Sequence, residues 1–189
     1  HARMEEEAGR FDLDDVADGI CKKLILRHPH IFGSVSGVKT AGDTLALWEE
    51  VKRQEKHQET DTDAMNGVAK SLPALIYAEK IQSRAKRSGF DWPTVQGALD
   101  KLREETCELE QAIAQNGSVE DELGDVLFAA VNVSRKLSVD PEGALVGAAK
   151  KFMTRFAAME RMAGDKLSDL SLTEMEALWQ RAKEETKQA

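Results

Sequence analysis

The sequence contains little cysteine, proline or tyrosine, and it has no long apolar run. Its 189 residues include two cysteines, four prolines and one tyrosine. Two cysteines cannot build a disulfide framework, which fits a reducing compartment, and they offer no metal-ligand spacing. No apolar run approaches the roughly 20 residues of a membrane span, and no charged start followed by an apolar core predicts a signal peptide. We therefore expect a soluble, cytoplasmic protein.

Positive charge is also scarce. Acidic residues outnumber basic residues by 34 to 26, which leaves a formal net charge of −8. Nucleic-acid backbones and anionic membranes both require a positive protein face. We therefore expect neither nucleic acid nor a membrane as a direct partner, while a phosphate ligand stays open if cations intervene.

The residues that are abundant predict an all-α fold. Alanine, leucine, glutamate and lysine are frequent and β-branched runs are few, a composition typical of helices. Residues that favour the N-cap position mark helix starts at Asp12, Asp43, Ser71, Asp140 and Ser171. Together with apolar periodicity they predict helices at residues 13–28, 44–57, 72–88, 94–115, 119–137, 141–162 and 172–187.

An internal repeat organises the chain. Residues 22–27 resemble residues 150–155 at an offset of 128, and residues 46–48 resemble residues 177–179 at an offset of 131. Such self-similarity predicts one repeat preceded by part of another. We expect residues 1–56 to be the C-terminal part of a first repeat, 57–70 a polar linker, and 71–189 a complete catalytic domain, with roughly 60 residues of the first repeat lying upstream.

Acidic residues lie on the apolar edges of the two helices at 94–115 and 119–137. At about 100° per residue, Glu105 lies roughly 40° from Leu109, inside the apolar seam of its helix. Glu122 lies about 40° from Val126 on the next helix by the same geometry. Glu108 flanks the first of these acids and Asp125 flanks the second.

The connection between these helices is short. Asn116, Gly117 and Ser118 form the turn, so the two helices must be antiparallel neighbours. Their four carboxylates then converge, and desolvated carboxylates need cations or must protonate. Oxygen-only ligands suit Mg²⁺ or Mn²⁺. The alternative is an ordinary charged hairpin whose acids face water or pair with Lys101 and Arg103.

These residues carry a resemblance to a known family. Glu104-Glu105-Thr-Cys-Glu108, followed by Glu122-Leu-Gly-Asp125, resembles the EExxE and ExxD signature of the all-α nucleoside triphosphate pyrophosphohydrolases, specifically the MazG branch. The resemblance extends over nearly the whole chain. It implies four-helix-bundle-like domains, in a tandem repeat whose first copy is incomplete here. It also implies Mg²⁺-dependent hydrolysis of nucleoside triphosphates to the monophosphate and pyrophosphate, for housekeeping or stress-response clearance of nucleotides.

The resemblance also implies roles for individual residues. The metal ligands would be Glu105, Glu108, Glu122 and Asp125. The candidates for taking a proton from the attacking water are the ligands Glu105 and Glu122 and the neighbouring Glu104. Residues matching phosphate-contacting positions are Lys101, Lys151 and Arg155. Trp179 matches a position near the nucleotide, where its indole would stack on the base, although a tryptophan on an amphipathic helix is also typical of packing.

Lys23, Arg27 and Trp48 are the first-copy equivalents of Lys151, Arg155 and Trp179. Without upstream carboxylates we expect this first half-site to be inert. Because a helical hairpin buries little surface by itself and the family forms dimers, we expect a homodimer.

Two other readings stay open from the sequence. One is a non-catalytic nucleotide-binding or interaction module of the same fold. The other is a related pyrophosphohydrolase that acts on dUTP or phosphoribosyl-ATP. All four ligand positions are acidic, which favours catalysis, and the tandem repeat favours the MazG branch.

Overall fold

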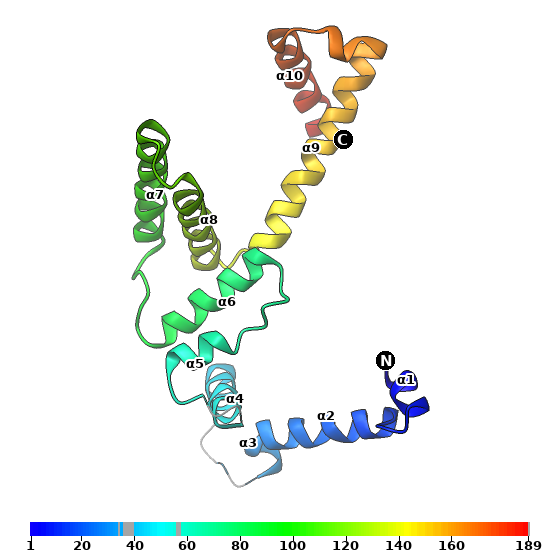
Figure 1. Cartoon of the computed structure of the whole chain (residues 1–189), viewed down its shortest axis with the longest axis vertical. Coiled ribbons are helices and arrows are strands. Elements are labelled where there is room, and N and C mark those ends of the chain that lie inside the picture. The colour runs from blue at the N-terminus through cyan, green and yellow to red at the C-terminus, as the bar shows by residue number, and fades with distance from the viewer. Residues whose placement is uncertain (34, 36–39, 56–57, 189) are drawn as a thin grey trace. The chain divides into compact units, whose positions relative to one another are not determined.

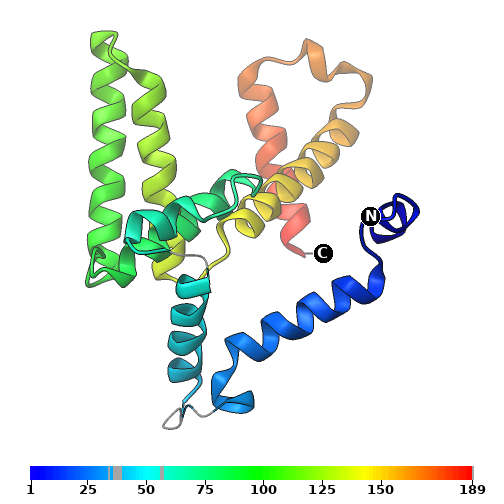
Figure 2. The same ribbon diagram turned by 60° about the horizontal axis from the view of Figure 1, so that its bottom comes forward.

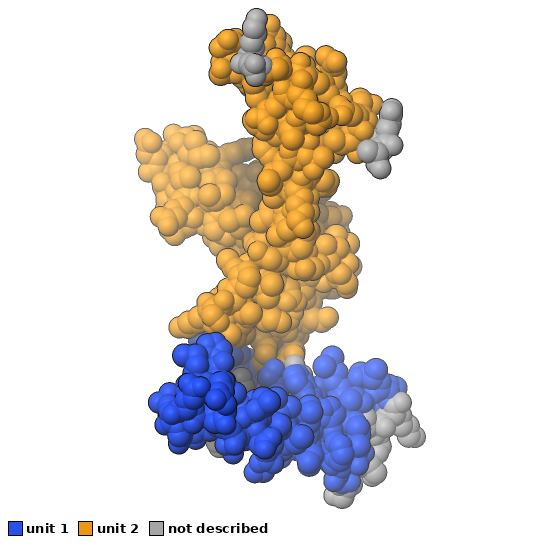
Figure 3. All heavy atoms as spheres, turned by 90° about the vertical axis from the view of Figure 1, so that its right-hand side faces the viewer, with its two compact units in different colours: residues 1–67 blue, residues 68–189 orange. Residues whose placement is uncertain are grey.

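The structure is a computed structural model that describes residues 1–33, 35, 40–55 and 58–188. The described residues form helices and no strand, which confirms the all-α prediction (Figure 1). The chain divides into two compact units, residues 1–67 and 68–189 (Figure 3). None of the described helices is both long and apolar enough to cross a membrane.

The first unit contains short helices around one longer pair. Its elements are α1 (Ala2–Glu7), α2 (Leu13–Arg27), α3 (Pro29–Phe32), α4 (Ala41–Glu55) and α5 (Asp61–Asn66). The predicted N-cap Asp12 is confirmed, because its carboxylate accepts a hydrogen bond from the amide of Asp15 and the Asp15 carboxylate accepts one in return. Proline cannot supply the amide that a continuing helix needs, and α2 ends two residues before Pro29.

Two expectations for the first unit need correction. Helix α4 begins at Ala41 rather than 44, because Thr40 is the residue that precedes it: the Thr40 hydroxyl accepts from the amide of Asp43, and the Asp43 carboxylate accepts from the amide of Thr40. The predicted end of this helix at residue 57 lies outside the described residues. The segment expected to be a linker, 57–70, contains helix α5, whose start is stabilised by a capping box between Thr60 and Asp63.

The second unit contains the longer helices. They are α6 (Ala74–Arg87), α7 (Val95–Gln115), α8 (Val119–Lys136), α9 (Pro141–Ala163), the 3₁₀ helix η1 (Gly164–Asp169) and α10 (Leu172–Gln188). Asp140 caps α9, and Ser171 forms a capping box with Glu174, as predicted. Ser71 does not cap α6, which begins after Pro73.

Helices α7 and α8 lie side by side as an antiparallel hairpin, and α9 packs with α10 in the same way (Figures 1 and 2). Small residues fill the contacts: Ala98 is 1% exposed and Ala129 is 6% exposed. Small side chains let helix backbones approach closely, but they bury little apolar area. Many larger apolar side chains therefore stay exposed, including Leu123 and Leu127 on α8.

Candidate active site

The turn between α7 and α8 sets the geometry of the acidic residues. Asn116 ends α7 in the left-handed backbone conformation, with φ 53° and ψ 39°. The next amide, that of Gly117, donates a hydrogen bond of 2.8 Å to the carbonyl of Ala112. This reversal places the second half of α7 beside the first half of α8, as the sequence predicted.

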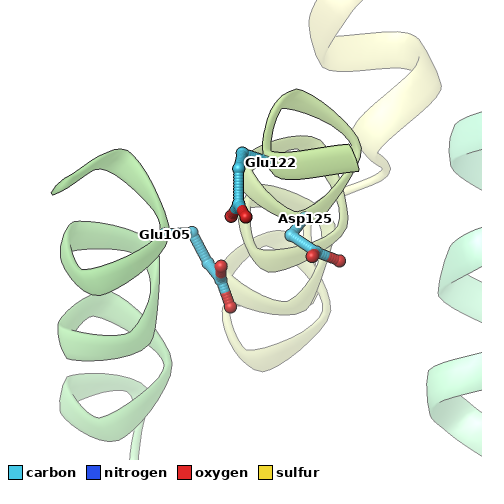
Figure 4. A group of neighbouring side chains, drawn as sticks. All are labelled: Glu105, Glu122 and Asp125. Carbon is cyan, nitrogen blue, oxygen red and sulfur yellow. The ribbon is translucent and has the colours of Figure 1, made fainter. Parts of the chain in front are cut away.

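Three of the predicted metal ligands meet across this hairpin. Glu105 projects from α7 toward Glu122 and Asp125 on α8 (Figure 4). Each offers one carboxylate oxygen, and these three oxygens all lie within 4.8 Å of one another. Glu105 is only 7% exposed, whereas Glu122 is half-buried and Asp125 is exposed. The prediction that Glu105 points along the packed seam is confirmed.

Glu108, the fourth predicted ligand, adjoins the same group through Glu105. A hydrogen bond with Glu105 and the negative charge of that carboxylate raise the pKa of Glu108 above its usual range. The structure therefore brings Glu108 beside Glu105, on the exposed side of α7.

Lys101 lies one turn before these acids on α7. Its ammonium is 2.8 Å from the carboxylate of Glu104 and 2.7 Å from that of Glu105. Hydrogen bonds to both carboxylates raise the pKa of Lys101 well above its ordinary value. Lys101 therefore supplies the positive charge that compensates the nearly buried Glu105.

The donor set fits a hard divalent cation. Glu105, Glu122 and Asp125 supply only oxygen atoms, and their negative charges converge on one small volume. Sharing these charges with a cation removes the repulsion that otherwise disfavours three carboxylates at this spacing. The cluster is thus able to hold a metal ion.

The other predicted site residues lie on the second hairpin. Arg155 on α9 donates from Nε to the hydroxyl of Thr186 on α10 at 3.4 Å, and Lys151 is exposed. The indole of Trp179 packs against the ring of Phe152, with centroids 5.2 Å apart. In Figure 1 the α9–α10 hairpin diverges from the α7–α8 hairpin, so the chain does not gather these residues around the carboxylates.

The sequence analysis missed an ionic network behind the hairpin. Asp91, in the segment before α7, pairs with Arg135 and Lys136 at the end of α8, and Arg135 also donates to Asn132 at 2.7 Å. The Arg135 hydrogen bond is the main cause that lowers the pKa of Asp91 to about 2. The partners are separated by more than 40 residues, so no local pattern revealed the pairing. The network fixes the entry of α7 against α8.

Comparisons with known proteins show the family of this chain. The model of the MazG nucleotide pyrophosphohydrolase domain matches residues 1–32 and 94–158, and the second range includes Glu105, Glu108, Glu122 and Asp125. The nucleoside triphosphate pyrophosphohydrolase of Escherichia coli strain K12 is 40% identical over 190 residues, which cover 97% of this chain and 72% of that protein.

Two further relatives cover the chain equally well. The nucleoside triphosphate pyrophosphohydrolase/pyrophosphatase MazG of Thermotoga maritima is 38% identical over 186 residues, covering 97% of this chain and 70% of the relative. The uncharacterized protein YabN of Bacillus subtilis is 39% identical over 190 residues, covering 97% of this chain and 38% of the relative. The family match and the long relatives establish that the chain belongs to the MazG nucleotide pyrophosphohydrolase family.

Proposed function

We propose that the chain hydrolyses nucleoside triphosphates to the nucleoside monophosphate and pyrophosphate, acting in housekeeping or stress-response clearance of nucleotides. The observation that carries the proposal is the convergence of Glu105, Glu122 and Asp125 oxygens within 4.8 Å on a helical hairpin. Relatives that cover most of the chain are named for this activity, which supports the proposal.

The residues proposed to hold Mg²⁺, or Mn²⁺, are Glu105, Glu122, Asp125 and the adjoining Glu108. When bound, such a cation neutralises charge on the polyphosphate and lowers the pKa of a water molecule. The hairpin holds the carboxylates in place, since Glu105 is nearly buried and the Asp91 network fixes the helix ends. The carboxylates proposed to take the proton from the attacking water are Glu104, Glu105 and Glu122.

Lys101, Lys151 and Arg155 are proposed to bind the phosphates, and Trp179 to lie by the base. Lys101 is already at the acidic cluster, where its ammonium can exchange a carboxylate for a phosphate oxygen. The other three residues are on the α9–α10 hairpin (Figure 1). Their joint action with the carboxylates requires the two hairpins to approach, or a second chain to supply one of them.

A homodimer is proposed for the same reason. Leu123 and Leu127, one turn apart on α8, are 47% and 52% exposed. Helix α9 exposes further large apolar side chains at helical spacing, namely Leu145, Val146, Phe152 and Met153. Contiguous apolar faces of this kind are typical of surfaces that associate. Association of two chains through these faces extends each hairpin into a four-helix bundle.

The cytoplasmic location expected from the sequence stays a prediction.

Pyrophosphate release tests the proposed activity. Wild-type protein and the Glu122→Ala variant are incubated with Mg²⁺ and a panel of nucleotides that includes dUTP and phosphoribosyl-ATP. Loss of a direct metal ligand is expected to lower release by about a hundredfold or more. Glu120→Ala, an exposed acid on the same helix, is the matched control and is expected to retain activity.

The outcomes separate the alternatives. Equal release by wild type and Glu122→Ala rejects the proposed site. Nucleotide binding without release by the wild type favours a binding module of the same fold. Release confined to dUTP or to phosphoribosyl-ATP favours one of the related pyrophosphohydrolases.

A further inference from the structure

Two helix pairs of this chain share one local design. In the first unit α2 contacts α4, with the short α3 between them in sequence, and in the second unit α9 contacts α10, with η1 between them. The N-caps Asp12 and Asp140 are 128 residues apart. The capping boxes Thr40–Asp43 and Ser171–Glu174 are 131 residues apart. The offsets that relate the sequences therefore also relate the starts of the helices.

The same guanidinium nitrogen is held in both pairs, but by different chemistry. In the first pair, Nε of Arg27 donates to the carboxylate of Glu55 at 2.8 Å. In the second pair, Nε of Arg155 donates to the hydroxyl of Thr186 at 3.4 Å. Arg27 and Arg155 match at the offset of 128, and positions 55 and 186 match at the offset of 131. A carboxylate thus stands in one copy where a hydroxyl stands in the other.

The difference between Glu55 and Thr186 changes how much net positive charge surrounds each arginine. The side chains of Arg27 and Glu55 are only 12% and 28% exposed, so their ion pair is poorly screened by solvent. An arginine neutralised in this way attracts an anion weakly. Thr186 instead donates its hydroxyl proton to the carbonyl of Ala182 at 2.9 Å, which leaves an oxygen lone pair for Arg155. The hydroxyl orients Arg155 without cancelling its charge.

The matched tryptophans, Trp48 and Trp179, also differ in whether cations of the chain cover the ring. The ring of Trp48 is covered by cations of its own unit, with the ammonium of Lys52 4.6 Å and the guanidinium of Arg27 5.4 Å from its centroid. Trp179 instead packs against Phe152. In the first unit, the guanidinium of Arg27 therefore contacts both the carboxylate of Glu55 and the face of the Trp48 ring.

We propose that the residue at this matched position determines which helix pair accepts a polyphosphate. Thr186 is a positioning residue that holds Arg155 toward a polyphosphate, and Glu55 excludes the same ligand from the Arg27 pair. The inference rests on the proposed function in that Arg155 is assigned to phosphate binding. It goes further by assigning a role to Thr186 and by giving a reason, within the chain itself, for the expectation that the first pair is inert.

The test uses the full chain and inorganic tripolyphosphate, with binding followed by calorimetry. Thr186→Glu is expected to weaken binding by about tenfold or more, because it recreates the ion pair of the first unit. Thr186→Gln, which has the same size without the charge, is expected to stay within about threefold of wild type. In an Arg155→Gln background, Thr186→Glu is expected to add no further loss. Equal effects of the two Thr186 variants, or no tripolyphosphate binding by the wild type, overturn the proposal.

The reverse change provides a gain that misfolding of α10 cannot imitate. Glu55→Gln is expected to create a second tripolyphosphate site, visible as increased stoichiometry and as a fluorescence change that is lost in Trp48→Phe. An unchanged stoichiometry overturns the exclusion role of Glu55. Pyrophosphate release is measured on the same wild-type preparation. Release without any difference between the Thr186 variants rejects only this inference, while the expected binding differences without release reject only the proposed activity.

Discussion

The ammonium of Lys101 lies 2.7 Å from the carboxylate of Glu105, four residues further along α7. Glu105 is the most buried of the acids that form the cluster. A carboxylate withdrawn from water is costly unless a positive charge lies nearby. Lys101 therefore stabilises the hairpin by compensating this charge, and the cation proposed for the cluster is expected to take over that task when it binds.

This pairing predicts the behaviour of a Lys101→Gln variant. In the presence of EDTA its free energy of unfolding is expected to fall by about 1 to 2 kcal/mol, because Glu105 loses its compensating charge. Mg²⁺ is expected to restore more stability to the variant than to the wild type. Urea denaturation with and without Mg²⁺ measures both effects. Arg103→Gln is the matched control, since Arg103 pairs with Asp100 at an exposed site, and its effect is expected to stay within about 0.5 kcal/mol. Identical Mg²⁺ effects in Lys101→Gln and wild type contradict the prediction.

The ion pairs of Asp91 predict a pH dependence of stability. Arg135, with Lys136, lowers the pKa of this carboxyl from 3.8 to about 2. A lowered pKa contributes stability that is fully present above the unfolded value and is lost as the pH falls through the folded value. After solvent screening is allowed for, the contribution is on the order of 1 to 2 kcal/mol at neutral pH.

The Asp91→Asn variant tests this dependence. Its deficit in the free energy of unfolding is expected to be constant above about pH 4 and to shrink between pH 4 and pH 2, because the wild type then loses the same charge. Denaturant titrations across this pH range measure the deficit. Asp100→Asn, at an exposed position, is the control. A deficit that does not change with pH would show that Asp91 acts through packing or hydrogen bonds alone.

The turn that joins α7 and α8 predicts a backbone effect. Asn116 has a φ of 53°, a conformation that side chains other than those of asparagine and aspartate adopt at a cost. Asn116→Ala is expected to lower the free energy of unfolding by about 1 kcal/mol, whereas Asn116→Gly is expected to match or exceed the wild type. Urea denaturation of the three proteins provides the comparison. Equal stability of the alanine and glycine variants would argue against backbone strain at this turn.

The exposed apolar face of α8 predicts the effect of a single charge on association. Leu127→Glu is expected to convert the proposed dimer into a monomer, because a buried carboxylate at the interface has no compensating charge. Light scattering coupled to gel filtration measures the mass. Leu172→Glu makes the same chemical change at an 80% exposed position on α10 and is expected to leave the dimer intact. A monomeric wild type at micromolar concentration rejects the proposed dimer.

Local chemistry made most of the helices predictable. The starts of α2, α9 and α10 follow from Asp12, Asp140 and Ser171, whose side chains accept amide hydrogen bonds within the same turn. The errors at α4 and α5 have the same origin. Thr40 and Thr60 are capping residues of the same kind, whose hydroxyls accept from the amides of Asp43 and Asp63, but the sequence analysis did not identify them as helix starts.

The acidic site also has features that the sequence predicted and features that it did not. Helical periodicity alone placed Glu105 in the seam and Glu122 on the facing helix, because a short turn leaves two helices little choice but to pack. The sequence offered pairing of the acids with Lys101 as the alternative to a metal site, and the rotamers of the long side chains decide that Lys101 contacts Glu105. Periodicity did not reveal the pairing of Asp91 with Arg135, because these two residues lie far apart in sequence.

The sequence by itself therefore determined the all-α class, the antiparallel α7–α8 hairpin and the acids that converge on it, since each follows from contacts within a few helical turns. Only the tertiary structure decided that α9 and α10 hold Arg155 and Trp179 apart from those acids, and that Glu55 and Thr186 treat matched arginines differently. Such relationships depend on how whole helices pack. In this chain the helices pack through small residues, which leaves many of the larger apolar side chains exposed. These exposed side chains are the surface that the proposed second chain would cover.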